Sequence, residues 1–236
     1  MVLNSTTKSN SVLIVAAHPD DEVLGCGGSI ARHADSGDKV HVLIVAEGAT
    51  SRQTTRDRDD ATDELLILAN ASKQAASILG AESVELLDLP DNRLDSIDRL
   101  DIIKIIESRI NTYKPECVYV HHIGDVNIDH RRLHEAVITA CRPVPENTVK
   151  RLISYEVVSS TEWQTPGSAR TFQPNWFVNI SDQLERKVKA LEVYSSEMRE
   201  WPHARSIESV LHLAHWRGAQ VGIDAAEAFC LLRNIS

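Results

Sequence analysis

The feature that most constrains the fold is a continuous apolar run near the N-terminus, SVLIVAA at residues 11–17, which stops at Pro19. An unbroken, largely β-branched run of this length predicts a strand buried on both faces, as in a parallel sheet. A helical pattern at about 28–34 and a Gly-Asp turn at 37–38 follow, and then a second such run, KVHVLIVA at 39–46. This order of strand, helix and strand predicts a right-handed crossover between parallel strands.

The alternation continues through the first half of the chain. Apolar spacing predicts amphipathic helices at 56–79 and 97–113, and short apolar runs predict strands at 83–87 and 116–121. Together these elements predict an α/β fold of the Rossmann-like kind, with a mainly parallel sheet flanked by helices. The second half is less regular. There we expect helices at 131–141, 182–194 and 207–221 and a strand at 152–158.

Composition limits the number of domains and the class of partner. The chain has 236 residues, 42% of them hydrophobic, which suits one domain over 1–236 better than two, with residues 1–10 flexible. The formal net charge of −9 argues against nucleic acid, which requires a basic surface. Neither a signal peptide nor a membrane-spanning run is found, so we expect a cytoplasmic protein. The oligomeric state is left open, and a homo-oligomer is possible.

Two loops rich in histidine and aspartate follow the first and fourth predicted strands. The first is His18-Pro19-Asp20-Asp21-Glu22, and the second is HHIGDVNIDH at 121–130. Ligands of open α/β sheets bind at the carboxyl ends of strands, so we expect both loops at one edge. The adjacent carboxylates at 20 and 21 repel unless a positive group separates them, and a divalent metal meets that need. Two histidines and an aspartate with an open position suit catalytic zinc, and also iron(II), cobalt or manganese.

These motifs resemble a known family. His18-Pro19-Asp20-Asp21-Glu22, then Gly25-Cys26-Gly27-Gly28 and later Asp129-His130, are similar to the zinc-dependent N-deacetylases named after the deacetylase of glycosylphosphatidylinositol biosynthesis, also called PIG-L or LmbE-like. The resemblance covers nearly the whole chain. It implies one Zn²⁺ per chain and a small-molecule substrate: an N-acetylated amino sugar, nucleotide sugar or glycoconjugate.

The resemblance also assigns roles to single residues. The residues that match the metal ligands are His18, Asp21 and His130. They leave one position for water, and Asp20 matches the general base. Asp129 is interpreted as a residue that orients a ligand. Many members have a histidine where this chain has Asn127, which can donate a hydrogen bond to an oxyanion but cannot supply a proton. Asp20 would then act as base and acid, unless a histidine helps. The candidates are His121, His122, His203, His212 and His215.

Substrate contacts are expected from the loops after the second and third strands. By resemblance, Asp91 matches an acidic residue that binds sugar hydroxyls, and Asn92 lies next to it. Arg52 or Arg56 would meet a phosphate or a carboxylate. The alternative is that residues 91–93 form only a turn.

Two other functions stay open. A binding protein on the same fold would retain metal and sugar affinity with little turnover, although the intact Asp20 argues against it. Another metal hydrolase, such as a phosphoesterase, would usually hold two metals bridged by carboxylates. A single metal per chain would count against that alternative.

Overall fold

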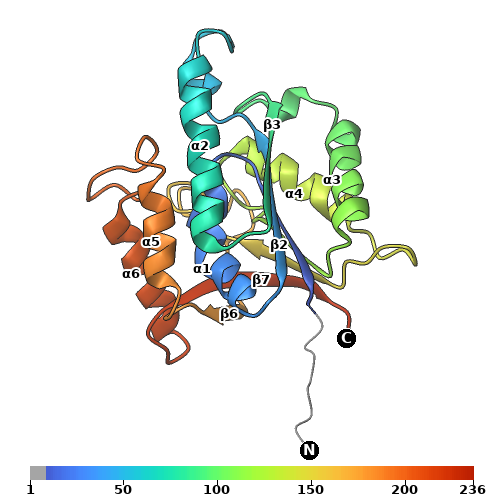
Figure 1. The fold of residues 1–236 in the computed structure, drawn as a ribbon, viewed down its shortest axis with the longest axis vertical. Helices are drawn as coiled ribbons and strands as arrows, with labels where there is room; N and C mark the ends of the chain where they lie inside the picture. The colour runs from blue at the N-terminus through green and yellow to red at the C-terminus, as the bar shows by residue number, and fades with distance from the viewer. Residues whose placement is uncertain (1–8) are drawn as a thin grey trace, which may run out of the picture.

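The computed structural model describes residues 9–236 and contains one seven-stranded sheet between two layers of helices (Figure 1). The strands are β1 (Ser11–Ala16), β2 (Lys39–Ala46), β3 (Ser83–Leu89), β4 (Cys117–His121), β5 (Arg151–Tyr155), β6 (Trp176–Asn179) and β7 (Ala226–Asn234). The α-helices are α1 (Asp21–Asp35), α2 (Thr62–Leu79), α3 (Arg99–Tyr113), α4 (Ile128–Ala140), α5 (Leu184–Glu192) and α6 (Ile207–Ala219). The single domain predicted over 1–236 stays a prediction, and the flexible segment predicted at its start falls mostly on residues 1–8, outside the described part.

The strand order is β3-β2-β1-β4-β5-β7-β6. The first five of these strands are parallel, whereas β7 pairs antiparallel with both β5 and β6. This arrangement confirms the predicted α/β fold with a mainly parallel sheet. Among residues 9–236, none of the helices combines the length and apolar character that crossing a bilayer requires.

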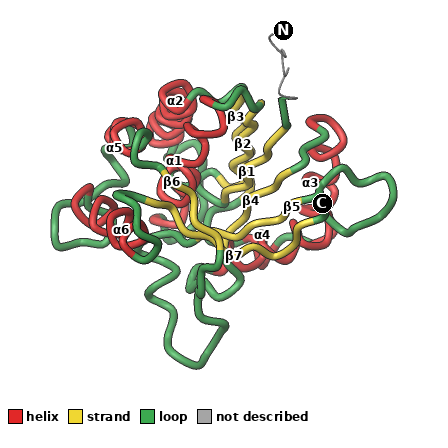
Figure 2. Tube along the Cα trace, turned by 90° about the horizontal axis from the view of Figure 1, so that it is seen from below, coloured by secondary structure: helices red, strands yellow, loops and turns green. Residues whose placement is uncertain are grey.

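The continuous apolar run of β1 is explained by the two layers. Val12 and Ile14 pack into the core on the side of α1, α2 and α5. Leu13 and Val15 point the other way, into the core formed with α3 and α4. Figure 2 shows the same division, with α1, α2, α5 and α6 on one side of the sheet and α3 and α4 on the other. Since both faces of β1 are covered, its positions after the partly buried Ser11 are all apolar.

Two predicted helix starts are wrong. Helix α1 begins at Asp21 rather than near residue 28, although glycines have low helix propensity. These glycines allow close packing: a side chain at position 25 would collide with the ring of Tyr155. Helix α2 begins at Thr62 rather than at 56, because the Asp57 carboxylate accepts the backbone N–H groups of residues 59 and 60 and forms a turn.

The remaining predicted elements differ from the observed ones by three residues or fewer at each end. Strands β6 and β7 were not predicted. In β7 the apolar pattern is interrupted by Glu227, which is buried as the partner of Lys187 at 2.6 Å. A buried charge has no signature in a sequence pattern when its partner lies on another element.

Candidate functional site

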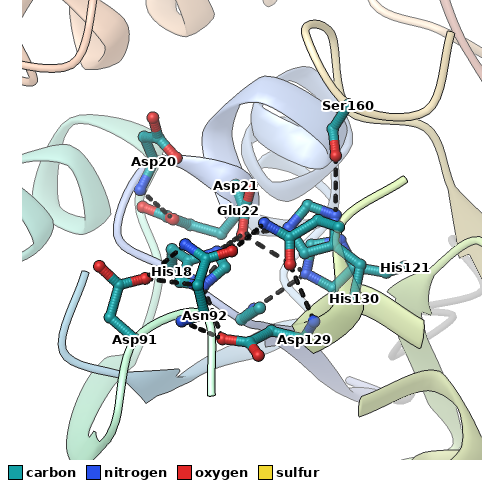
Figure 3. A network of polar contacts seen from close by, with 12 residues as sticks. His18, Asp20, Asp21, Glu22, Asp91, Asn92, His121, Asp129, His130 and Ser160 are labelled. Carbon is teal, nitrogen blue, oxygen red and sulfur yellow. Dashed lines mark hydrogen bonds and ion pairs between the residues drawn. The ribbon is translucent and has the colours of Figure 1, made fainter. Parts of the chain in front are cut away.

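The two predicted loops meet at the carboxyl edge of the sheet. Strands β1 and β4 are neighbours, so the segments that follow them lie side by side. His18 lies on the loop after β1, Asp21 is the first residue of α1, and His130 lies in the first turn of α4. Figure 3 shows these three side chains converging. The sequence-based prediction that both loops share one edge is therefore confirmed.

The side chains of His18, Asp21 and His130 form a compact donor set. One ligand atom from each lies within 4.8 Å of the others. Asp21 Oδ2 is 3.2 Å from His18 Nδ1 and 3.2 Å from His130 Nε2. Two buried atoms of the set lack a well-aligned hydrogen bond: Asp21 Oδ1, and His130 Nε2, which has only the ion-pair contact to Asp21 Oδ2. Such an atom costs about 1–3 kcal/mol when left unsatisfied. A divalent cation would satisfy both atoms, so the residues fit a metal site.

Each histidine of the set is oriented by a carboxylate on its far nitrogen. Asp129 Oδ2 is 3.0 Å from His18 Nε2, so Asp129 supports His18 rather than its neighbour in sequence, His130. His130 Nδ1 instead lies 3.0 Å from Asp125 Oδ2. Carboxylates in this position fix the ring orientation of metal-binding histidines.

Asp125 was not singled out by the sequence analysis, although it lies within the predicted second loop. Burial by itself would raise its pKa, but His130 and hydrogen bonds that include one from Ser160 lower the pKa to about 2. The hydroxyl of Thr161 also donates to it at 2.8 Å. Asp125 therefore stays ionised at neutral pH.

A second group of possible ligands consists of His18, Asp91 and Asp129. It shares His18 with the first group. Both carboxylate oxygens of Asp129 also accept backbone N–H groups, from Asn92 at 2.7 Å and from Leu94 at 2.8 Å. The second group thus supports the first one and does not offer a separate set of three ligands.

Asp20 points away from its neighbour Asp21 (Figure 3). Its backbone φ is 110°, a value that side-chain-bearing residues seldom adopt. Its carboxylate is buried and accepts a hydrogen bond from Arg205 Nη1 at 3.0 Å. Burial raises the pKa of Asp20 well above its usual range, and the charge of Arg205 opposes this shift only in part. The adjacent carboxylates therefore have separate positive neighbours, an arginine for Asp20 and histidines for Asp21, where the sequence pointed to one metal between them.

Arg205 belongs to a network from the second half of the chain that the sequence analysis did not find. Its Nε donates to Ser159 Oγ at 2.7 Å, and its Nη1 lies 3.7 Å from Glu197 Oε2. Glu197 in turn accepts two hydrogen bonds from Arg52 Nη2, both of 2.7 Å. No repeated spacing marks this loop-rich segment.

Glu22 is a further buried acid next to the site. The hydroxyl of Tyr194 donates to Glu22 Oε1, and the backbone N–H of Asp20 donates to Oε2. Burial raises the pKa of Glu22 to about 7. Its hydrogen bond to the backbone of Asp20 helps to hold the unusual conformation there.

The predicted substrate-binding residues lie along the same edge. Asp91 is buried, accepts the N–H of Ser51 and has Oδ1 3.3 Å from His18 Nε2. Asn92 has a positive φ of 53° and donates from Nδ2 to Asp91 Oδ1 at 3.0 Å. Residues 91–93 thus form a turn and also reach the site. The two arginines are engaged elsewhere, Arg52 with Glu197 and Arg56 with Glu47.

Both polar atoms of the Asn127 side-chain amide form hydrogen bonds. Its Oδ1 accepts the N–H of Asp129 at 2.8 Å, which makes it the N-cap of α4. Its Nδ2 donates to Asn92 Oδ1 at 2.9 Å. A second amide hydrogen remains for another acceptor.

Comparison with known proteins places this site in a family. A model of the PIG-L family, described as GlcNAc-PI de-N-acetylase, matches residues 13–141. Diacetylchitobiose deacetylase from Thermococcus kodakarensis is 29% identical over 209 residues, which cover 83% of this chain and 75% of that protein. 4-Oxalmesaconate hydratase from Pseudomonas putida is 28% identical over 240 residues, which cover 94% and 87%.

A solved structure shares the fold. N,N'-diacetylchitobiose deacetylase from Pyrococcus horikoshii superposes with a TM-score of 0.72 at 21% identity, and the match covers 99% of this chain and 87% of that one. The family match itself spans more than half of the 236 residues and contains all three residues of the donor set. The chain therefore belongs to the PIG-L family of GlcNAc-PI de-N-acetylases.

Proposed function

We propose that this protein is a metal-dependent hydrolase that removes the N-acetyl group from an amino sugar, a nucleotide sugar or a glycoconjugate. The observation that carries the proposal is the buried donor set of His18, Asp21 and His130, two of whose atoms lack a well-aligned hydrogen bond, next to the separately held carboxylate of Asp20. Family membership and the deacetylase relative support the choice of reaction.

His18, Asp21 and His130 would hold the metal, for which we propose Zn²⁺ with one ion per chain. When bound there, the ion would lower the pKa of a water molecule and polarise the amide carbonyl of the substrate. Asp125 and Asp129 keep the two histidine rings in position through their far nitrogens.

Asp20 is the proposed general base. Its carboxylate accepts a proton from the attacking water and passes it to the amine nitrogen as the carbon–nitrogen bond breaks. Arg205 holds one carboxylate oxygen in place. Asp91 and Asn92 are the proposed contacts for sugar hydroxyls. The oxyanion contact of Asn127 stays a prediction of the sequence, and we expect it to contribute little, because the amide already caps α4 and donates to Asn92.

The test is acetate release from a panel of N-acetylated sugars, sugar nucleotides and lipid-linked sugars by zinc-loaded protein. Asp20→Asn is the matched variant, because it keeps the size of the side chain and removes the base. We expect release by the unchanged protein, loss of release in the variant, and the same metal content in both. Absence of release across the panel, with metal verified as bound, would contradict the proposal.

A second candidate is hydration of a carbon–carbon double bond in a polycarboxylate. It is favoured by the hydratase relative, which matches 94% of this chain. A decrease in the ultraviolet absorbance of a conjugated unsaturated acid, with no acetate release from any amide, would select this reaction.

The phosphoesterase alternative has less support, because the two possible ligand groups share His18 and do not form two complete sites. The alternative of a pure binding protein leaves the buried, arginine-held Asp20 without a role.

A further inference from the structure

A pocket of about 240 Å³ lies beside the proposed general base. Its walls include Ser159, Trp163, Glu197, Arg199, His203 and Arg205. Arg205 connects the pocket to the site, since the same guanidinium that lines the pocket donates to Asp20 Oδ2 at 3.0 Å. A molecule in this pocket would therefore lie one side chain away from Asp20. The proposed contacts for sugar hydroxyls, Asp91 and Asn92, do not line it, whereas Arg52, which the sequence analysis expected to meet a phosphate or a carboxylate, lies on its wall.

The pocket has an excess of positive charge. Arg52, Arg199 and Arg205 line it, and Glu197 is the acidic residue on its walls. Arg52 is paired with Glu197, and Arg205 with Asp20. Arg199 is exposed, and no carboxylate among residues 9–236 forms an ion pair with it. On a chain with a net charge of −9, this is a local cation without a neutralising partner.

The Arg199 guanidinium is also held in place. Its Nη1 donates to the backbone oxygens of Ser196 at 2.7 Å and Met198 at 2.8 Å. The backbone N–H of Arg199 donates to the oxygen of Arg205 at 3.1 Å, which closes the loop and brings both arginines to the same wall. A cation fixed in this way loses less side-chain entropy when it binds an anion.

His203 adds a second donor to the wall. Its Nδ1 accepts the backbone N–H of Arg205 at 3.0 Å, so in the neutral ring the proton is on Nε2. Trp163, with 54% of its surface exposed, meets the His203 ring edge to face at 5.9 Å between centroids. The wall thus presents hydrogen-bond donors and an aromatic surface.

Acceptors on these walls are already engaged. Glu197 accepts two hydrogen bonds from Arg52, and Ser159 Oγ accepts one from Arg205. A sugar hydroxyl both donates and accepts, whereas a carboxylate or phosphate oxygen only accepts. The pocket therefore matches an anionic group better than a neutral sugar.

We propose that this pocket is the subsite for a carboxylate or phosphate substituent on the amino-sugar substrate, with Arg199 and His203 as its donors. The inference rests on the proposed deacetylase function. Trp163 would cover an apolar face of the substrate next to the charged group.

The kinetic test compares substrates that carry the same acetamido group. N-acetylglucosamine is the neutral member, its 1-phosphate and 6-phosphate are the phosphate arm, and N-acetylmuramic acid is the carboxylate arm. At least one charged substrate is expected to have a KM about 10-fold below that of the neutral sugar, in line with one charge-assisted contact. The arm that shows this effect identifies the anion.

Arg199→Ala is expected to reduce this preference to less than about threefold, and Arg199→Lys to retain part of it. Arg142→Ala removes a similarly exposed arginine from the end of α4, next to Glu107, and serves as the control that should retain the full preference. Equal KM values for all substrates, or a preference that survives in Arg199→Ala, would overturn the subsite.

A binding measurement separates the two proposals. Calorimetry with glucosamine 6-phosphate, glucosamine 1-phosphate, muramic acid and neutral glucosamine measures the affinity for deacetylated products without turnover. Acetate release without any preference would overturn the subsite and leave the deacetylase standing. Arg199-dependent binding of a charged product without acetate release from any amide would support the subsite and overturn the deacetylase.

Discussion

Asp20 and Asp21 are adjacent in the sequence but belong to two differently built sides of the site. The histidine side consists of Asp21 with His18 and His130, and it comes from the segments after two neighbouring parallel strands. The arginine side consists of Asp20 with Arg205, Glu197 and Arg52, and two of these four residues, Glu197 and Arg205, come from loops of the second half. The backbone conformation at Asp20, with φ of 110°, turns the two carboxylates apart.

The two sides differ in what brings their residues together. On the histidine side, the sheet topology brings the proposed ligands together, because β1 and β4 pair directly. On the arginine side, Asp20 meets a residue 185 positions away in the chain through a single loop contact. In the proposed function the first side would hold a cation, whereas the second side contains arginines, so substitutions on the two sides should have separable effects.

The largest expected effect comes from Asp21→Asn, compared with Asp20→Asn. Asp21→Asn removes a charged ligand, so the protein should lose bound metal and its activity should fall to background. Asp20→Asn should retain the metal and lower kcat about 10²- to 10⁴-fold, the usual contribution of a general base. The measurements are metal content by mass spectrometry and initial rates of acetate release. Equal loss of metal in both variants would show that the two sides are not separable.

Arg205→Met should have the next largest effect. Without the guanidinium, the buried Asp20 carboxylate loses its positive partner and its fixed position, and misplaced catalytic groups typically cost about 10²-fold in rate. Metal content should not change, and Arg205→Lys should recover part of kcat. A variant that keeps full activity would show that Arg205 is only structural. A thermal melt controls for unfolding of the loop.

Asp125→Asn tests the support of the histidine side. Asp125 Oδ2 faces His130 Nδ1 at 3.0 Å, and loss of such a partner typically weakens metal binding about 10- to 100-fold. A competition titration with a chelator measures this affinity. The matched comparison is Asp129→Asn, because Asp129 contacts Nε2 of His18 as Asp125 contacts Nδ1 of His130. An unchanged metal affinity in both variants would show that the two carboxylates do not support the proposed metal site.

These residues also show what could be predicted from the sequence. The apolar runs and their order predicted the parallel sheet, and the ends of the predicted strands pointed to the two loops rich in histidine and aspartate. The choice of His18, Asp21 and His130 within these loops came from the family resemblance. Asp125 lay within the predicted second loop, but the direction of its side chain depends on packing against Ser160 and Thr161. Arg205 could not be found, because neither periodicity nor a strand end marks its loop.

The smallest expected effect concerns Asn127, which lies on the histidine side but holds no proposed metal ligand directly. Its Oδ1 caps α4 through the N–H of Asp129, and its Nδ2 donates to Asn92. Asn127→Ser keeps a capping oxygen and removes the amide, so we expect no large change in melting temperature and a kcat within about threefold of the unchanged protein. Asn127→Ala removes the cap as well and should lower the free energy of unfolding by about 1 kcal/mol.

Comparing the two variants distinguishes a role of Asn127 as a helix cap from a role as an oxyanion donor. Loss of a single oxyanion donor typically costs about 10²- to 10³-fold in kcat, far more than the change expected for Asn127→Ser. A loss of that size with an unchanged denaturation midpoint would mean that the second amide hydrogen of Asn127 contacts the reacting group. The histidine side would then contribute to catalysis beyond holding the metal, and the division of roles between the two sides would need revision.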